Sequence, residues 1–199
     1  PLWKNSSLSD RLTIIKQYHA LLERDNELLA TTLTEEVGKP LQQSRNEVNG
    51  SRSRIEWMLA NASNYLSDET MSVSENMQEI IKYEPLGVVC NISAWNYPYL
   101  VGTNVFIPAL LAGNAVLYKP SEYATLTGLH IERLLKEGFY VFAIARSSGE
   151  LGRLFDVYPQ NLQHVVADLS IKTEVYKSID EIKSKISHID ILVNNAGVF

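Results

Sequence analysis

The sequence contains one cysteine, so it cannot form a disulfide within the chain. A single thiol is typical of a reducing compartment, and we expect a cytoplasmic protein. Long uninterrupted apolar runs are also missing, so we expect no membrane-spanning segment and no membrane partner. The net charge of −5 excludes a strongly basic surface and with it a nucleic-acid partner held by charge. The four histidines stand singly, so no metal site is predicted.

What the chain does have is 45% hydrophobic and 21% charged residues, the composition of a globular protein. Its most informative stretch is 85–122, PLGVVCNISAWNYPYLVGTNVFIPALLAGNAVLYKPSE. The apolar run 87–92 predicts a strand buried on both faces, and 99–111 has helical spacing. Gly113 is placed to end that helix, and 115–118 predicts a second buried strand. Together they form a βαβ unit, in which nucleotides bind at the carboxyl ends of the strands.

This stretch resembles the coenzyme domain of the aldehyde dehydrogenase family. The segments PLGVV, AWNYP and IPALLAGNAVLYKPSE occur in the family's order, and the likeness extends from Trp3 through EEVGKP to about Glu137. The resemblance implies an α/β fold, with a doubly wound parallel Rossmann-like sheet preceded by a helical segment and a short β-strand. It also implies an oxidoreductase that converts a small aldehyde to a carboxylic acid with NAD or NADP as its cofactor.

The resemblance assigns roles to individual residues. Asn96 matches an oxyanion-hole donor and is the catalytic candidate, because an amide N–H can stabilise a developing negative charge. Lys119 and Glu122 match the pair that holds the adenosine ribose, whose vicinal hydroxyls a lysine and a glutamate can bond. Taken singly, these residues have a plainer interpretation, in which Asn96 caps a turn and Lys119 ends a strand in solvent. Three more residues line the cofactor groove in that family: Ile92, Ser93 and Trp95.

Beyond about residue 138 the sequence changes character. An aldehyde dehydrogenase would continue toward a second glycine motif, a catalytic glutamate and a nucleophilic cysteine, whereas this chain reads GFYVFAIAR, LQHVVADLS and IDILVNNAG. These segments resemble the short-chain dehydrogenase/reductase family, whose NNAG motif falls at Asn194–Gly197. The resemblance implies that Asn194 and Gly197 contact the cofactor, and that Asp168 follows the strand that contacts adenine.

Arg146 follows the predicted strand 139–145 and matches the position that holds the 2′-phosphate in NADP-preferring members of that second family. A guanidinium suits this role because it pairs bidentately with phosphate. The alternative is a surface arginine at a strand end.

The chain thus divides into 1–137, which is aldehyde dehydrogenase-like, and 138–199, a short-chain dehydrogenase-like βαβαβ fragment. Strands alternating with helices predict one parallel sheet. Because 87–92 already lies on one side of 115–118, we expect 189–193 to pair beyond 87–92. The expected order is therefore 163–167, 139–145, 115–118, 87–92, 189–193, all parallel.

Neither half has its complete chemistry. The loop 120–127 contains no glycine, so a phosphate-cradling turn of the short-chain type is missing. No tyrosine has a lysine four residues on, and Cys90 is expected to be buried in an apolar strand, where a thiolate is costly. We therefore expect a catalytically silent fragment. The alternatives left open are a short-chain dehydrogenase fragment, a non-catalytic nucleotide-binding or interaction module, and an artificial chimera.

The first 66 residues predict three amphipathic helices, with Trp57 and Met58 in the core. The first is expected to be capped by Ser9, and the second is expected to stop at Gly38-Lys39-Pro40. The polar segment 67–76 predicts a loop, and 78–83 predicts a strand. In the aldehyde dehydrogenase family the strand at that place belongs to a small sheet used in subunit contacts, which leaves a homo-oligomer open.

Overall fold

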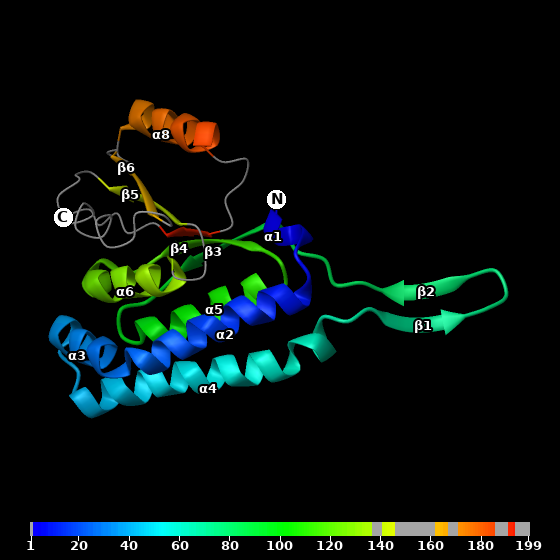
Figure 1. Ribbon diagram of the computed structural model, residues 1–199, viewed down its shortest axis with the longest axis horizontal. Coiled ribbons are helices and arrows are strands. Elements are labelled where there is room, and N and C mark those ends of the chain that lie inside the picture. Colours follow the sequence, from blue (N-terminus) through cyan, green and yellow to red (C-terminus); the bar gives the residue numbers. More distant parts are fainter. Residues whose placement is uncertain (1, 137–140, 146–161, 167–170, 186–190, 194–199) are drawn as a thin grey trace.

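The computed structural model describes residues 2–136, 141–145, 162–166, 171–185 and 191–193. In Figure 1 a layer of helices lies against one face of a parallel sheet, α8 lies on the other face, and a two-stranded hairpin projects from the body. This is the α/β class that the sequence predicts. Among the described helices, none is both long enough and apolar enough to cross a bilayer.

The chain begins with a short helix and three long ones: α1 (Leu2–Asn5), α2 (Leu8–Arg24), α3 (Asn26–Val37) and α4 (Leu41–Tyr65). The expected cap at Ser9 is wrong, because Ser7 and Asp10 form a capping box at the start of α2. Helix α3 ends as predicted at Gly38, which has a left-handed φ of 73°. Trp57 lies on the surface with 57% of its area exposed, so its predicted place in the core is wrong.

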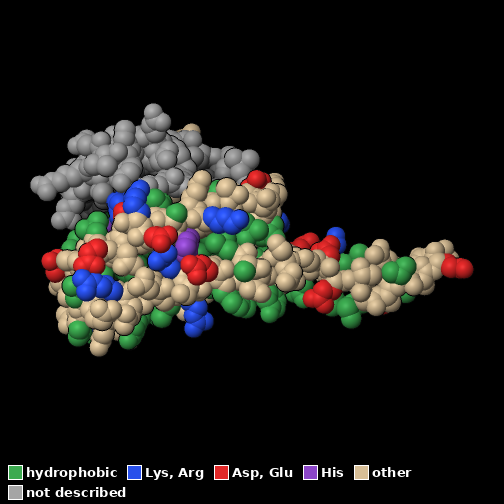
Figure 2. Space-filling view, turned by 60° about the horizontal axis from the view of Figure 1, so that its bottom comes forward, with side chains coloured by type: hydrophobic (Ala, Val, Ile, Leu, Met, Phe, Trp, Pro, Cys, Tyr) green, Lys and Arg blue, Asp and Glu red, His purple; other side chains and the backbone are tan. Residues whose placement is uncertain are grey.

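Helix α4 leads into the antiparallel hairpin of β1 (Glu69–Val73) and β2 (Gln78–Ile81). The predicted strand at 78–83 is confirmed, but the predicted loop at 67–76 contains β1. Every residue of both strands is exposed, so β1 lacks the buried alternation by which strands are recognised. Figure 2 shows the hairpin as a narrow arm that stands clear of the body.

The main sheet contains β3 (Val88–Ile92), β4 (Ala115–Lys119), β5 (Val141–Ala145), β6 (Leu162–Val166) and β7 (Ile191–Val193). All its pairings are parallel and its order is β3-β4-β7-β5-β6. The two segments of the chain that resemble different families therefore share one sheet.

The predicted position of the last strand is wrong. β7 pairs with β4 on one side and β5 on the other, so β5 does not lie directly beside β4. In this central place the backbone of β7 is paired along both sides, and β3 takes the open edge that the predicted order gave to β7. The short apolar sequence Ile191–Val193 also suits a strand flanked on both sides.

Because β7 takes that place, β3 is one of the two edge strands of the described sheet. Val88 is 70% and Ile92 is 74% exposed, so the prediction that this strand is buried on both faces is wrong. Cys90 is exposed as well, contrary to expectation. The sheet nevertheless keeps the predicted βαβ unit, in which β3 and β4 are adjacent.

The helices that connect the strands cover the sheet from two sides (Figure 1). They are α5 (Pro98–Leu111), α6 (Thr125–Lys136), which follows a 3₁₀ turn at Glu122–Ala124, and α8 (Lys172–Lys185). Helix α5 packs on β3 and β4, α6 on β5, and α8 on β6. Leu126 of α6 is 51% exposed rather than inward as its spacing suggests, while Ile131, Leu134 and Leu135 are buried.

The core lies between the helical layer and the first βαβ unit. The ring of Phe106 on α5 meets those of Tyr18 on α2 and Tyr118 on β4 edge-on, with centroids 5.8 and 5.7 Å apart. Gly102 permits this packing, because a Cβ there would lie 3.1 Å from both Phe106 and the Tyr118 hydroxyl. The core thus fixes α5, and with it the loop that precedes α5, against β4.

The far end of α5 is tied down by the first residues of the chain. The Trp3 indole donates to the carbonyl of Leu110 at 3.0 Å, and Arg11 donates to the carbonyl of Leu111 at 2.7 Å. These bonds satisfy carbonyls that the helix leaves without intrahelical partners. Gly113 follows with a φ of 85° and starts the turn into β4, as predicted.

Candidate functional site

The strands of the parallel sheet all have their carboxyl ends at the same end of the sheet, which is where a βαβ fold binds ligands. In the pairing register Ile92 lies opposite Lys119, the last residues of β3 and β4. The backbone N–H of Ser93 donates to the Lys119 carbonyl at 3.0 Å, which extends the contact one residue beyond the strands. Three of the predicted groove and ribose residues are therefore brought together.

Lys119 and Glu122 form a pair at this edge, with Nζ and Oε2 3.1 Å apart. The Ser121 hydroxyl accepts from the backbone of Tyr123 and starts the 3₁₀ turn that places Glu122 three residues after the lysine. Hydrogen bonding to its own backbone N–H and then to Lys119 lowers the pKa of Glu122. Both side chains are partly exposed, so a lysine donor and a carboxylate acceptor are presented together to solvent.

The predicted groove residues differ in their exposure. Ile92 and Trp95 are open to solvent, and Trp95 is 50% exposed. Ser93 is buried, although its backbone lies in the loop after β3. Asn96 is exposed in the same loop, just before Pro98 begins α5. The end of β3 and the loop thus carry one buried anchor, Ser93, and three accessible candidates, Ile92, Trp95 and Asn96.

Two residues that the sequence analysis did not single out hold this loop. Lys39 donates from Nζ to the main-chain carbonyl of Asn96 at 2.6 Å and pairs with Glu47 Oε2 at 2.5 Å. The same ammonium lies 4.1 Å from the ring centre of Tyr97. The other carboxylate oxygen, Oε1 of Glu47, accepts from the backbone N–H of Tyr99 at 2.9 Å.

Glu47 is an unusual residue in its surroundings. Its side chain is fully buried, and burial raises its pKa, while hydrogen bonding to Lys39 and to backbone amides opposes the rise. A signal for it exists in the sequence, since Glu47 falls on the same helical stripe as Ser44, Val48, Ser51 and Ile55. A carboxylate on an inward stripe requires a buried partner.

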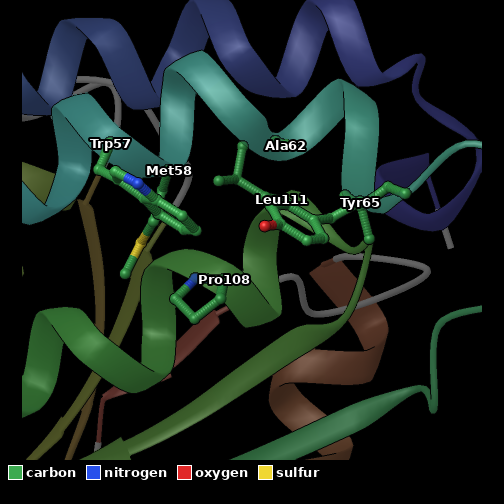
Figure 3. A pocket seen from close by; sticks show the side chains of 7 residues that line it. Trp57, Met58, Ala62, Tyr65, Pro108 and Leu111 are labelled. Carbon is green, nitrogen blue, oxygen red and sulfur yellow. The ribbon is translucent and has the colours of Figure 1, made fainter.

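An apolar cavity of about 210 Å³ lies elsewhere, between the last turns of α4 and α5 (Figure 3). Its lining is almost wholly hydrophobic: Trp57, Met58, Ala62, Tyr65, Leu66, Pro108 and Leu111. It adjoins the C-terminal end of α5, which is the end opposite the Asn96 loop. Such an apolar lining does not suit a phosphate or a ribose, and the cavity is not part of the candidate site.

The remaining predicted cofactor residues lie outside the described residues: Arg146, Asp168, Asn194 and Gly197. Each comes soon after a described strand, namely β5, β6 or β7. Within the part of the chain that the structure describes, no three acidic, histidine or cysteine side chains gather as metal ligands would.

Comparison with known proteins gives two family matches. Residues 1–140 match the aldehyde dehydrogenase family and residues 128–199 match the short chain dehydrogenase family. The 3-sulfolactaldehyde dehydrogenase of Pseudomonas putida is 28% identical over 161 residues, which cover 79% of this chain and 33% of that protein. The N-succinylglutamate 5-semialdehyde dehydrogenase of Paraburkholderia xenovorans (strain LB400) is 33% identical over 122 residues, or 61% of this chain and 25% of that protein.

The fold agrees with these matches. A solved succinic semialdehyde dehydrogenase from Streptococcus pyogenes, in complex with NADP+ as the cofactor, superposes with a TM-score of 0.64 at 17% identity. That likeness covers 83% of this chain and 42% of the other. The chain spans a quarter to a third of the length of the two curated relatives. Because the family match covers residues 1–140, well over half of the sequence, the chain belongs to the aldehyde dehydrogenase family.

Proposed function

We propose that this chain is the part of an NAD(P)-dependent aldehyde dehydrogenase that binds the adenosine half of the cofactor and supplies an oxyanion donor. The observation that carries the proposal is the accessible Lys119–Glu122 pair at the carboxyl end of β4. The proposed substrate is a small aldehyde, and the proposed product is its carboxylic acid.

In this proposal the cofactor lies along the edge formed by β3 and β4. The Lys119 ammonium donates to a ribose hydroxyl, and the Glu122 carboxylate accepts from one. Ile92 and Trp95 present apolar surface to the cofactor groove, while the buried Ser93 anchors the loop. The Asn96 side-chain amide stabilises the negative oxygen that forms when a nucleophile attacks the aldehyde carbon.

The second segment makes a competing contribution to cofactor choice. Arg146 would favour the 2′-phosphate of NADP, whereas Glu122 would repel it. Asp168, Asn194 and Gly197 are proposed as further cofactor contacts from the same segment. Because the loop 120–127 has no glycine to cradle a pyrophosphate, we give Glu122 precedence and propose weak binding of NAD.

The test is a calorimetric titration of the 199-residue chain with NAD and with NADP. Wild type is expected to bind NAD weakly and NADP more weakly still, and Glu122→Gln is expected to reduce this preference. Lys119→Met should weaken both. Glu75→Gln, in the exposed turn of the hairpin, is the matched control and should change neither. NADP binding that is clearly tighter and is lost in Arg146→Ala would reverse the ranking.

A second candidate function, an interaction module that works beside another subunit, is favoured by the hairpin. Five of its large apolar side chains are exposed: Met71, Val73, Met77, Ile80 and Ile81. Such an arm fits a subunit contact, and a second copy of the chain is the proposed partner. Light scattering should detect an oligomer that Val73→Ser with Ile80→Ser dissociates, while the exposed Leu28→Ser control does not. A wild-type monomer at high concentration would contradict this.

A further inference from the structure

Lys39 fastens the loop between β3 and α5 to the helical layer. The Lys39 ammonium reaches the Asn96 carbonyl, lies against the Tyr97 ring and pairs with Glu47. All three partners lie close to the chain turn that carries Trp95 and Asn96. The lysine itself comes from the short turn between α3 and α4, about 57 residues earlier in the chain.

Glu47 completes the attachment from beneath. Its Oε1 accepts from the Tyr99 backbone in the first turn of α5, where the backbone N–H groups have no intrahelical partner. The negative charge is also favourable there because of the helix dipole. One buried carboxylate thus binds the end of the loop directly and its middle through Lys39.

A buried ion pair is a poor device for stability alone, because the cost of removing two charges from water offsets their attraction. Helices α3 and α4 already share an exposed ion pair, Glu27 with Arg45, which joins them without burying a charge. The buried pair therefore requires a reason beyond holding these helices together. Among the described residues, the hydrogen bonds and the ring contact that this pair makes outside the two helices go to the loop and to the start of α5.

We propose that Lys39 and Glu47 are positioning residues, which act through the Ser93–Tyr97 loop to set Asn96 and Trp95 for the cofactor and the developing oxyanion. This inference rests on the proposed function for its purpose, but the attachment of the loop can be measured without any ligand. Both residues lie in the helical layer, away from the carboxyl ends of β3 and β4 where the cofactor is proposed to bind.

The attachment depends on pH with a definite sign. Burial raises the pKa of Glu47, so as pH falls Glu47 takes up a proton before an ordinary glutamate does, and Lys39 then loses its charged partner. The other titratable groups that face Glu47 are the phenols of Tyr99 on α5 and Tyr118 on β4. Both phenols stay neutral as pH falls, because burial raises the pKa of each, and that of Tyr118 to about 12.

The experiment measures amide hydrogen exchange of residues 93–100 and the NMR signal of the Asn96 side-chain amide in the full chain. Glu47→Gln keeps the shape and an acceptor for the Tyr99 amide but removes the charge. Lys39→Met removes the cation, and Lys39→Arg restores it. The matched control is Glu27→Gln with Arg45→Gln, the exposed pair between the same two helices.

We expect Glu47→Gln and Lys39→Met each to speed exchange of the loop about five- to tenfold and to shift the Asn96 signal. Lys39→Arg should recover most of the protection, and the control pair should leave it unchanged. Wild-type exchange should also rise as pH is lowered, after correction for the intrinsic rate, and this rise should vanish in Glu47→Gln.

Loop protection and an Asn96 signal that stay at wild-type values in Lys39→Met and Glu47→Gln would overturn the proposal. Equal effects from the control pair would also overturn it, since the ion pair would then only join the helices. NAD affinity, measured in parallel, should fall with loop protection. If wild type binds no dinucleotide, the proposed function fails, while the exchange and NMR results still decide whether Lys39 and Glu47 hold the loop.

Discussion

The carboxylate of Glu36 caps a helix that lies 91 residues further along the chain, because its Oε2 accepts from both the backbone N–H and the hydroxyl of Thr127, at 2.9 and 2.8 Å. Its other oxygen accepts from the backbone N–H of Leu126 at 2.6 Å. Helix α6 therefore obtains from α3 the acceptor that a capping residue of its own would normally supply. This contact fixes the helix that follows the proposed ribose pair.

Glu36→Gln should lower the free energy of unfolding by about 1 kcal/mol, because it removes the charge at the helix N-terminus and weakens the acceptors. Urea unfolding at neutral pH measures this. Glu35→Gln is the control, since Glu35 is exposed and adjacent, and its effect should stay within about 0.5 kcal/mol. Equal effects from the two substitutions would show that the cap contributes nothing.

Two glycines with left-handed backbones provide a matched test of packing. Gly38 has a φ of 73° and nothing within 4 Å of an added Cβ, so Gly38→Ala should cost only the conformational strain, about 1 kcal/mol. At Gly113, with a φ of 85°, an added Cβ would lie 2.8 Å from Arg11 Nη1. The guanidinium would have to leave the Leu111 carbonyl, so Gly113→Ala should cost about 2 kcal/mol or more.

The excess at Gly113 should disappear when Arg11 is absent. In an Arg11→Ala background, Gly113→Ala should cost no more than Gly38→Ala does in the wild type. Thermal or urea unfolding of the wild type, the three single variants and the Arg11→Ala, Gly113→Ala double variant measures the coupling. An excess that persists without Arg11 would mean that the turn, and not the arginine, rejects the side chain.

The sequence predicted the parts of the fold that depend on local pattern. The βαβ unit and the end of α3 at Gly38 follow from short apolar runs and glycine placement, and both are confirmed. The likeness of both segments to known families is confirmed as well. The strand β1 was missed because a hairpin that stands in solvent shows no buried alternation.

The strand order could not be predicted from the same signals. An apolar triplet such as 191–193 predicts a buried strand but not which strands lie beside it. The strand order depends on which strands still have an unpaired backbone side. The wrong order in turn gave the wrong exposure for β3 and Cys90. The link from Lys39 to Asn96 was missed for a similar reason, since nothing local joins residues so far apart. The one local signal was Glu47, an acidic residue on the inner stripe of α4, which indicated a buried partner.

Asp25 should make stability depend on pH in the acid range. Its carboxylate accepts from Arg24 at 2.7 Å and from Arg133 at 2.6 Å. Hydrogen bonding to Arg24 is the largest cause that lowers the pKa of Asp25, from 3.8 to about 2, while burial opposes it. A depressed pKa contributes stability that is present above the unfolded value, so this part is lost as pH falls from about 4 towards 2.

Asp25→Asn should therefore destabilise the chain at neutral pH by about 1 kcal/mol, a figure reduced for solvent screening, and the difference should shrink steadily as pH falls towards 2. Urea unfolding at several pH values checks this, with the exposed Asp180→Asn as control. A difference between wild type and Asp25→Asn that is constant across this range would show that the carboxylate acts by packing and not by charge.

The 199-residue polypeptide should show no NAD(P)-dependent oxidation of aldehydes or alcohols above background. Oxidation of an aldehyde by this family's chemistry requires a thiolate nucleophile and a general base, and the one thiol is that of Cys90. Cys90 is exposed, but it lies inside β3, two residues before the strand end and outside the sequence context of the family's nucleophile. Asn96 can stabilise an oxyanion only after a nucleophile has attacked.

Absorbance of NADH at saturating cofactor with short aldehydes measures the rate. Steady NADH production that Cys90→Ala abolishes would show that Cys90 is a nucleophile after all.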